Sequence, residues 1–228
     1  MKSIFIHIAK CGGMSMESIC RENNILIDPL NNDESPDSPH PSLSDLNNTW
    51  DTNLFTSIEN EPSIDFSFTF VRNPFPRLVS AWKCPWVTGP KFEWVSRTPK
   101  EALKFVPTQK RFNNQFEKGF ADFVKRFVAI EKDWNFYRWS HVMPFTDPRT
   151  KLFNNKGEQI IDYIGKLETY QQDFDQVCDK IGIPKQSLPH SNKTKHKHYT
   201  EYYDLDTLNL VKQIYKNDLD CFGYKFGD

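Results

Sequence analysis

The chain has 228 residues, a formal net charge of −1 at pH 7 and an aromatic content of 14%. Its length suffices for one α/β domain with a sizeable core, and so many aromatic residues exclude global disorder. The near-neutral charge argues against a dedicated nucleic-acid binder. The five cysteines are scattered and show no metal-ligand spacing, so we expect reduced thiols in a reducing compartment.

The N-terminal stretch predicts a buried parallel strand that leads into a phosphate-binding turn. An apolar run ends at Ile8 and is followed by one lysine, two glycines and a serine: Lys10, Gly12, Gly13 and Ser15. The glycine pair allows a tight turn and lets an anion approach the main-chain N–H groups. A helical pattern follows, and its N-terminal dipole favours an anion at the same place.

Met1 lies too close to this strand to leave room for a signal peptide. No apolar stretch approaches the length of a transmembrane helix. We therefore expect a cytoplasmic protein without a membrane span.

Residues 28–63 are rich in Asn, Asp, Ser and Pro, a composition typical of a long loop. A loop of this length often carries a function. It contains His40, although a single loop histidine is commonly a solvated surface residue.

The next predicted strand carries alternating aromatic residues: Phe66, Phe68 and Phe70. Asn73 can cap the helix that follows, and Pro74 suits its first turn. Arg72 thus stands at the carboxyl end of a strand, the edge where open α/β sheets bind ligands. A guanidinium group there suits bidentate phosphate binding.

Two motifs together give the chain a family resemblance. The order Lys-x-Gly-Gly-x-Ser at residues 10–15 resembles the 5′-phosphosulfate loop of sulfotransferases that use 3′-phosphoadenosine 5′-phosphosulfate (PAPS). Residues 70–81, Phe-Val-Arg-Asn-Pro-x-x-Arg-Leu-Val-Ser-Ala, resemble the 3′-phosphate motif of the membrane-associated and bacterial carbohydrate sulfotransferases. The resemblance implies one domain over residues 1–228 with a P-loop-like, three-layer α/β fold, in which helices flank a central, mostly parallel sheet.

The same resemblance implies sulfuryl transfer from PAPS to an acceptor hydroxyl, with a carbohydrate as the favoured acceptor. Lys10 is expected near the bridging oxygen of the leaving group, where it offsets the developing charge. Catalysis then depends on positioning and electrostatics, with no metal required. The residues expected to bind the cofactor are Lys10, Cys11, Gly12, Gly13, Met14, Ser15, Arg72, Ser80, Lys193 and Lys195.

The acceptor hydroxyl is a weak nucleophile that needs a base, and histidine has a suitable intrinsic pKa. In several relatives the base is a histidine between the two motifs, and His40 is the only histidine in that interval here. His141 precedes Met143 and Pro144, and some relatives carry a histidine there as well. We favour His40 and keep His141 as the second candidate, whereas His7 lies inside the first strand and is expected to be packed.

Residues 84–140 are aromatic and irregular, and we expect them to form a variable helical region on the acceptor side. Within this region, the spacing of Phe120, Phe123, Val124 and Phe127 predicts an amphipathic helix. Core packing explains that stripe better than acceptor binding does.

The last third of the chain predicts one more strand, at residues 159–165, followed by a helix that ends at Gly182. Glu168 lies between them and matches the family's Gly-x-x-Glu pattern, with helix capping or an internal hydrogen bond as an alternative to a catalytic role. A final helix should turn Leu208, Val211 and Tyr215 inward.

Two other functions remain open. A nucleotide-dependent kinase of the P-loop type would need a lysine directly after the last glycine of its loop and a carboxylate for Mg²⁺, and neither pairing is present. A non-catalytic protein that binds a glycan or PAP, the desulfated form of the cofactor, could retain the same motifs. The sequence leaves the oligomeric state and the identity of the acceptor open.

Overall fold

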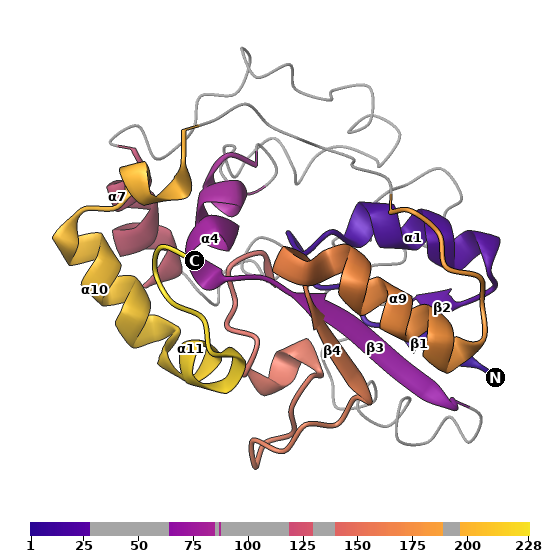
Figure 1. The fold of residues 1–228 in the computed structure, drawn as a ribbon. Coiled ribbons are helices and arrows are strands. Elements are labelled where there is room, and N and C mark those ends of the chain that lie inside the picture. The colour runs from indigo at the N-terminus through magenta and orange to yellow at the C-terminus, as the bar shows by residue number, and fades with distance from the viewer. Residues whose placement is uncertain (28–63, 85–86, 88–118, 130–139, 189–196) are drawn as a thin grey trace, which may run out of the picture.

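A computed structural model describes residues 1–27, 64–84, 87, 119–129, 140–188 and 197–228 of the chain. The described strands form one four-stranded parallel sheet in the order β2-β1-β3-β4 (Figure 1). The strands are β1 (Ser3–Phe5), β2 (Leu26–Ile27), β3 (Phe66–Val71) and β4 (Tyr163–Lys166). A parallel sheet flanked by helices confirms the expected α/β fold class.

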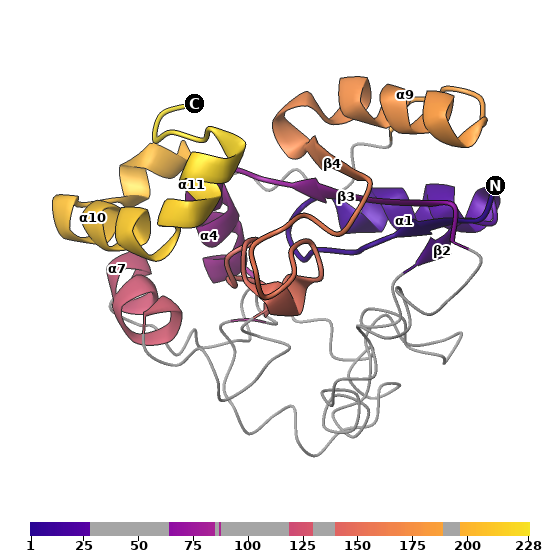
Figure 2. The ribbon, with the colours of Figure 1, turned by 90° about the horizontal axis from the view of Figure 1, so that it is seen from below.

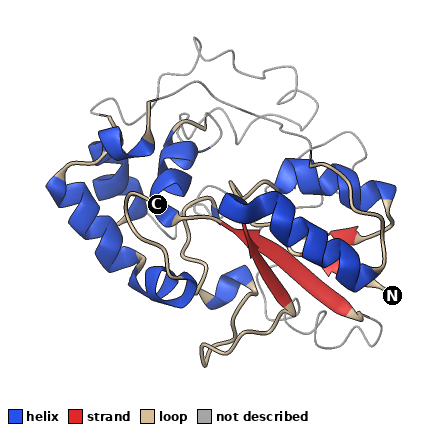
Figure 3. Ribbon diagram, viewed as in Figure 1, coloured by secondary structure: helices blue, strands red, loops and turns tan. Residues whose placement is uncertain are grey.

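Helices lie against the sheet and beside it (Figure 3). The α-helices are α1 (Gly13–Glu22), α4 (Pro74–Trp82), α7 (Phe120–Asp122), α9 (Tyr170–Ile181), α10 (Leu205–Ile214) and α11 (Lys216–Phe222). A π-helix, η2 (Phe123–Val128), follows α7, and the short 3₁₀-helices are η3 (Pro148–Thr150), η4 (Leu167–Thr169) and η5 (Tyr199–Tyr202). Within the ranges given above, no helix is long and apolar enough to cross a membrane.

Helices α1 and α9 pack on one face of the sheet. Apolar side chains from both helices meet aromatic residues of β1 and β3 in a single buried cluster: Phe5, Met16, Ile19, Cys20, Phe66, Phe68, Phe70, Phe174, Val177 and Cys178. Full burial of one phenylalanine side chain stabilises a fold by about 1.5–3 kcal/mol, so this layer fixes both helices to the sheet. The predicted helix end at Gly182 is confirmed, since α9 stops there with φ at 75°, the left-handed value.

The opposite face of the sheet is covered by irregular chain and the C-terminus. Apolar residues of β1 and its continuation pack there against residues 145–161 and the end of α11. This cluster includes Ile4, Ile6, Ile8, Val71, Phe145, Leu152, Phe153, Ile161, Phe222 and Tyr224. The carboxyl ends of β1 and β3 therefore lie next to the segment that follows residue 140.

A third cluster lies beside the sheet, where α4 packs with α7, η2, η5 and α10 (Figure 2). The predicted amphipathic helix belongs to it, with Phe120, Phe123 and Val124 buried. Its second half is π-helical rather than α-helical, and the Ala129 amide bonds the Val124 carbonyl at 3.1 Å. Val211 and Tyr215 are buried in the same cluster, as predicted for the last helix.

The central strand, β3, is buried on both faces. Its phenylalanines alternate with Ser67 and Thr69, whose hydroxyl groups are satisfied inside the protein. Ser67 donates to the Asp162 carboxylate at 2.7 Å, and Thr69 donates to the Ile6 carbonyl at 2.6 Å. These bonds explain how an alternating pattern, which normally indicates a half-exposed strand, fits a fully buried one.

The last strand begins later than its sequence pattern predicts. The pattern covers residues 159–165, whereas β4 spans Tyr163–Lys166. Gln159 instead forms an antiparallel bridge with Phe153. The chain joins the sheet at Asp162, whose carboxylate accepts a bond of 2.8 Å from the Ser67 amide.

Candidate active site

The phosphate-binding turn predicted from the sequence lies at the carboxyl end of β1. The chain turns at residues 9–12 and enters α1 at Gly13. Lys10 (φ 67°) and Gly12 (φ 85°) both adopt the left-handed backbone conformation. For a lysine this conformation costs about 1–3 kcal/mol, and the surrounding contacts must offset that cost.

Tyr170, the first residue of α9, supports the turn from the side. Its hydroxyl donates to the Gly12 carbonyl at 2.9 Å. A Cβ at position 12 would lie only 2.9 Å from the Tyr170 ring, so the ring approaches the turn more closely than any side chain at position 12 would allow. Burial raises the pKa of Tyr170, which keeps its hydroxyl protonated as a donor.

His7 supports the turn from behind. Its Nδ1 lies 2.6 Å from the Glu17 carboxylate of α1. A Cβ built on Gly13 would lie 1.8 Å from the His7 ring nitrogen Nε2, so the start of α1 rests directly on the imidazole. The expected packed role of His7 is confirmed, although His7 lies two residues beyond the end of β1 rather than inside the strand. Gly13 is needed for this close approach.

The first turn of α1 leaves amide groups directed ahead of the helix. The amides of Ser15 and Met16 close back onto the Gly12 carbonyl at 3.1 and 3.3 Å. Gly13 and Met14 precede that turn, and helix geometry gives their amides no carbonyl partner within α1. An anion at this helix start would meet main-chain donors and the positive end of the helix dipole.

Two arginines from the second motif hold consecutive carbonyls of the turn. Arg72, directly after β3, donates from Nη1 to the Lys10 carbonyl at 3.4 Å. Arg77, in α4, donates from Nε to the Ala9 carbonyl at 3.3 Å. The motif that resembles a 3′-phosphate site therefore also supports the strained backbone at Lys10. Burial lowers the pKa of Arg72, although a guanidinium remains charged at neutral pH.

Arg77 also holds the segment that carries His141. Its Nη2 donates to the Ser140 carbonyl at 3.1 Å and its Nη1 to the Met143 carbonyl at 2.7 Å. The guanidinium carbon lies 4.2 Å from the centre of the Phe145 ring, a cation–π contact. With only 1% of its surface exposed, Arg77 is a buried link between the phosphate-binding turn and residues 140–145.

Residues near the C-terminus hold the same segment from the other side. The fully buried Asp218 carboxylate accepts from the amides of Phe145 (2.7 Å) and Thr146 (2.9 Å). Tyr215 donates its hydroxyl proton to the Val142 carbonyl. Burial raises the pKa of Asp218, while these donors oppose the shift.

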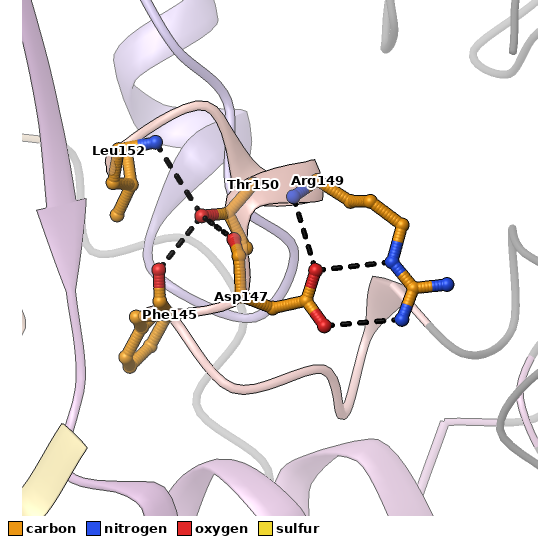
Figure 4. Close-up of polar contacts among 5 residues, drawn as sticks. All are labelled: Phe145, Asp147, Arg149, Thr150 and Leu152. Carbon is orange, nitrogen blue, oxygen red and sulfur yellow. Dashed lines mark hydrogen bonds and ion pairs between the residues drawn. The ribbon is translucent and has the colours of Figure 1, made fainter. Parts of the chain in front are cut away.

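A tight turn closes the segment after Phe145 (Figure 4). The Thr150 hydroxyl lies 2.7 Å from the Phe145 carbonyl and 2.8 Å from the Asp147 carbonyl. Asp147 caps η3 through the Arg149 amide at 3.0 Å and holds the Arg149 guanidinium through both carboxylate oxygens. The polar groups of Asp147, Arg149 and Thr150 bond one another and the main chain of this turn, so we assign them a structural role.

Glu168 links the end of β4 to the start of α4 and to the C-terminus. One carboxylate oxygen accepts from the Asn73 amide at 2.8 Å, and the other accepts from the Tyr224 hydroxyl at 3.0 Å. Asn73 in turn caps α4 by accepting from the Phe75 amide at 3.1 Å, as predicted. The expected alternative of an internal hydrogen bond for Glu168 is confirmed, and its charge lies near Arg72.

Cys11 lies within the turn but is chemically protected. Its side chain is 2% exposed, and burial raises the pKa of its thiol to about 11. The thiol form therefore prevails at neutral pH. In the part of the chain that the structure describes, no group of three or more His, Cys, Asp or Glu residues could hold a metal ion.

The structure brings some of the predicted site residues together. The loop from Lys10 to Ser15, Arg72 and the buried His141 share one neighbourhood through the contacts of the two arginines. Ser80 lies in α4, roughly 9 Å along the helix axis from its first residue, Pro74. The remaining candidates lie outside the described residues: His40, Lys193 and Lys195.

The sequence did not predict a supporting role for three residues: Arg77, which lies within the second motif, Tyr170 and Asp218. Arg77 carried a signal, because its spacing from Pro74 and Ala81 places it on the apolar face of α4. A charged residue on such a face predicts burial with partners, although it does not name them. The local sequence pattern did not indicate which groups Tyr170 and Asp218 contact.

Comparisons with known proteins give one family. A model of the sulfotransferase family matches residues 2–225. Curated relatives named carbohydrate sulfotransferase 10 align at 25% identity: the Gallus gallus protein over 76% of this chain and 50% of its own length, the Xenopus laevis protein over 70% and 47%, and the Homo sapiens protein over 72% and 48%. The chain thus spans about half the length of the curated relatives it matches. No solved structure matches the chain.

Proposed function

Since this chain belongs to the sulfotransferase family, we propose that it transfers the sulfuryl group of PAPS to a hydroxyl group of a carbohydrate. The main observation behind this proposal is the turn at residues 9–12. It leads into the N-terminus of α1, and Arg72 holds it from the end of the neighbouring strand. The name of the curated relatives supports a carbohydrate as the acceptor.

The donor groups at this edge of the sheet fit an anionic nucleotide. The start of α1, Lys10 and Arg72 all lie at this edge, and this combination of residues is typical of phosphate binding. PAPS, when bound, supplies the sulfuryl group and leaves as PAP. In the proposed site the amides at the start of α1 bind the 5′-phosphate, and Lys10 offsets the negative charge that develops on the leaving oxygen.

The proposed 3′-phosphate contacts come from the second motif and the basic segment. Arg72 and Ser80 bind this phosphate, and Lys193 and Lys195 close over it. The position of Arg72 against the Lys10 carbonyl supports this assignment, because one guanidinium has five donors and can serve the turn and a phosphate together. A histidine, His40 or His141, accepts the proton of the acceptor hydroxyl.

A ligand-stabilisation experiment tests the cofactor. PAP should raise the melting temperature of the protein by mass action, with a gain of about 2.7 kcal/mol at 100 times its Kd, and ATP with Mg²⁺ should do so much less. Equal stabilisation by both nucleotides would favour the kinase alternative. Transfer of label from isotopically labelled PAPS to one of a panel of sugars, lipids and phenols would then separate an enzyme from a non-catalytic PAP- or glycan-binding protein.

A matched pair of arginine variants sharpens this test. Arg72→Ala should remove most of the PAP effect, because one lost charge-assisted contact costs about 1.5–3 kcal/mol. Arg126→Ala removes the same charge from η2, where the side chain is exposed and pairs with Asp122. It should leave PAP binding unchanged, so equal losses in both variants would contradict a specific role for Arg72.

A further inference from the structure

Arg77 contacts two peptide groups that lie far apart in the sequence. Its Nε donates to the Ala9 carbonyl at 3.3 Å and its Nη2 to the Ser140 carbonyl at 3.1 Å. The first carbonyl belongs to the peptide bond that leads into Lys10, and the second to the peptide bond that leads into His141. One side chain therefore touches the backbone immediately before each of two candidate catalytic residues.

The chemistry of the guanidinium group makes this contact rigid. It is planar, and its donors point in fixed directions, so two carbonyls bonded to neighbouring nitrogens are held in one geometry. The third bond, to the Met143 carbonyl at 2.7 Å, holds the far side of the turn that carries His141. The Phe145 ring, 4.2 Å from the guanidinium carbon, holds the plane itself.

Burying the charge of Arg77 costs free energy, which indicates that the geometry of its hydrogen bonds has a function beyond stability. The described hydrogen bonds of Arg77 all go to main-chain carbonyls, so its buried charge is balanced by dipoles rather than by a bonded carboxylate. Apolar packing of similar volume often stabilises a fold as well as or better than buried charge does. What a planar cation adds is a fixed separation between the groups it joins.

We infer that Arg77 is a positioning residue that sets the separation between Lys10 and His141. The inference rests on the proposed function, in which Lys10 acts on the leaving group and His141 is one of two candidates to act on the acceptor hydroxyl. The two groups must then meet the same sulfuryl centre from opposite sides in an in-line displacement. A displacement of about 1 Å between such groups can cost roughly a hundredfold in rate.

The first test is Arg77→Lys, which keeps the positive charge but cannot hold three carbonyls in one plane. At saturating PAPS we expect kcat to fall by about 10- to 100-fold. The Kd for PAP should change by about threefold or less, because Arg72 and the helix start are untouched. Unchanged kcat in this variant would overturn the inference.

Tyr203→Phe is the matched control for lost packing. The Tyr203 hydroxyl donates to the Phe75 carbonyl at 2.9 Å, so it also tethers α4, but this bond goes to neither of the two peptide groups that Arg77 holds. Its loss should lower the melting temperature and leave kcat unchanged well below that temperature. A fall in kcat equal to that of Arg77→Lys would mean that general loosening of α4 is the cause, and would overturn the positioning role.

A double-mutant cycle identifies the residue that Arg77 positions. If the role is correct, His141→Ala lowers kcat, and adding Arg77→Lys to it lowers kcat little further, because the group to be placed is already gone. The inference is overturned if His141→Ala retains the wild-type kcat, or if Arg77→Lys costs the same factor in both backgrounds.

A measurement without turnover separates this inference from the proposed function. In NMR spectra of the protein without ligand, the Lys10 amide and the His141 ring resonances should move together in Arg77→Lys and remain in place in Tyr203→Phe. Resonances that stay in place in Arg77→Lys would overturn the link. If wild-type protein binds no PAP and transfers no label, the proposed function fails, whereas the NMR result still reports on the link.

Discussion

The turn at residues 9–12 and the segment at residues 140–146 meet at Arg77, yet they are held in different ways. The turn lies at a strand-to-helix junction, and much of its shape comes from the left-handed backbone of Lys10 and Gly12. Arg72, Arg77 and Tyr170 then bond its main-chain carbonyls. The segment has almost no regular structure and is held by buried polar side chains from distant parts of the chain: Arg77, Tyr215 and Asp218. An anion site can be built from backbone groups in a short motif, whereas a segment that presents one side chain needs partners that only the fold can supply.

The largest effect on activity should come from the turn. If Lys10 acts on the leaving group, Lys10→Ala should lower kcat by about 10²–10⁴ and change PAP affinity far less. Single-turnover transfer from labelled PAPS measures the rate, and PAP titration measures affinity. Lys216→Ala, at an exposed position in α11, is the control with the same charge change. A Lys10 variant that loses PAP binding but keeps its rate at saturation would assign Lys10 to ground-state binding instead.

The largest effect on stability should come from the segment. Asp218→Ala leaves the buried Phe145 amide, the partly buried Thr146 amide and the Thr146 hydroxyl without their acceptor, and should lower the free energy of unfolding by about 3–5 kcal/mol. Urea denaturation followed by tryptophan fluorescence measures this change. Asp220→Ala, two residues on in the same helix, removes only an exposed pair with Lys216 and should cost about 1 kcal/mol or less. Similar losses in the two variants would mean that the segment does not depend on Asp218.

A smaller effect is expected from replacing Gly12, where the cost of a positive φ adds to the close contact with the Tyr170 ring. Gly12 and Gly182 both have positive φ values, 85° and 75°, but only Gly12 lies against a ring, that of Tyr170. Gly182→Ala should cost about 1–2 kcal/mol of stability from strain alone and leave PAP affinity unchanged. Gly12→Ala should in addition weaken PAP binding by about tenfold or more, since the turn must shift. Unchanged PAP affinity in Gly12→Ala would show that the turn tolerates the shift.

The smallest effect concerns the thiol in the turn. With the pKa of Cys11 raised to about 11, its thiolate fraction at pH 8 is roughly a thousandth, so iodoacetamide should modify it at least about tenfold more slowly than the exposed Cys221. The rate at Cys11 should rise as the pH approaches 11, because the thiolate is the reactive form. Peptide mass spectrometry gives both rates. Equal rates at pH 8 would contradict the buried position of Cys11.

Features that depend on neighbouring residues could be predicted from the sequence. Strand β3, the Asn73 cap, the turn after β1 and the end of α9 at Gly182 all followed from local apolar pattern and backbone preference. The order of the two motifs was also enough to indicate the family, because each motif is a contiguous run whose backbone meets the ligand.

Which distant groups meet depends on how the whole chain folds. The bonds from Arg77 to Ser140 and from Asp218 to Phe145 join residues 63 and 73 positions apart, and no local periodicity encodes such a pairing. The same holds for β4, whose start was predicted too early because the Asp162 carboxylate and the pairing with β3 decide where the strand begins. Buried polar groups must find partners wherever the fold places them, so their burial can be predicted from the sequence but the identity of each partner cannot.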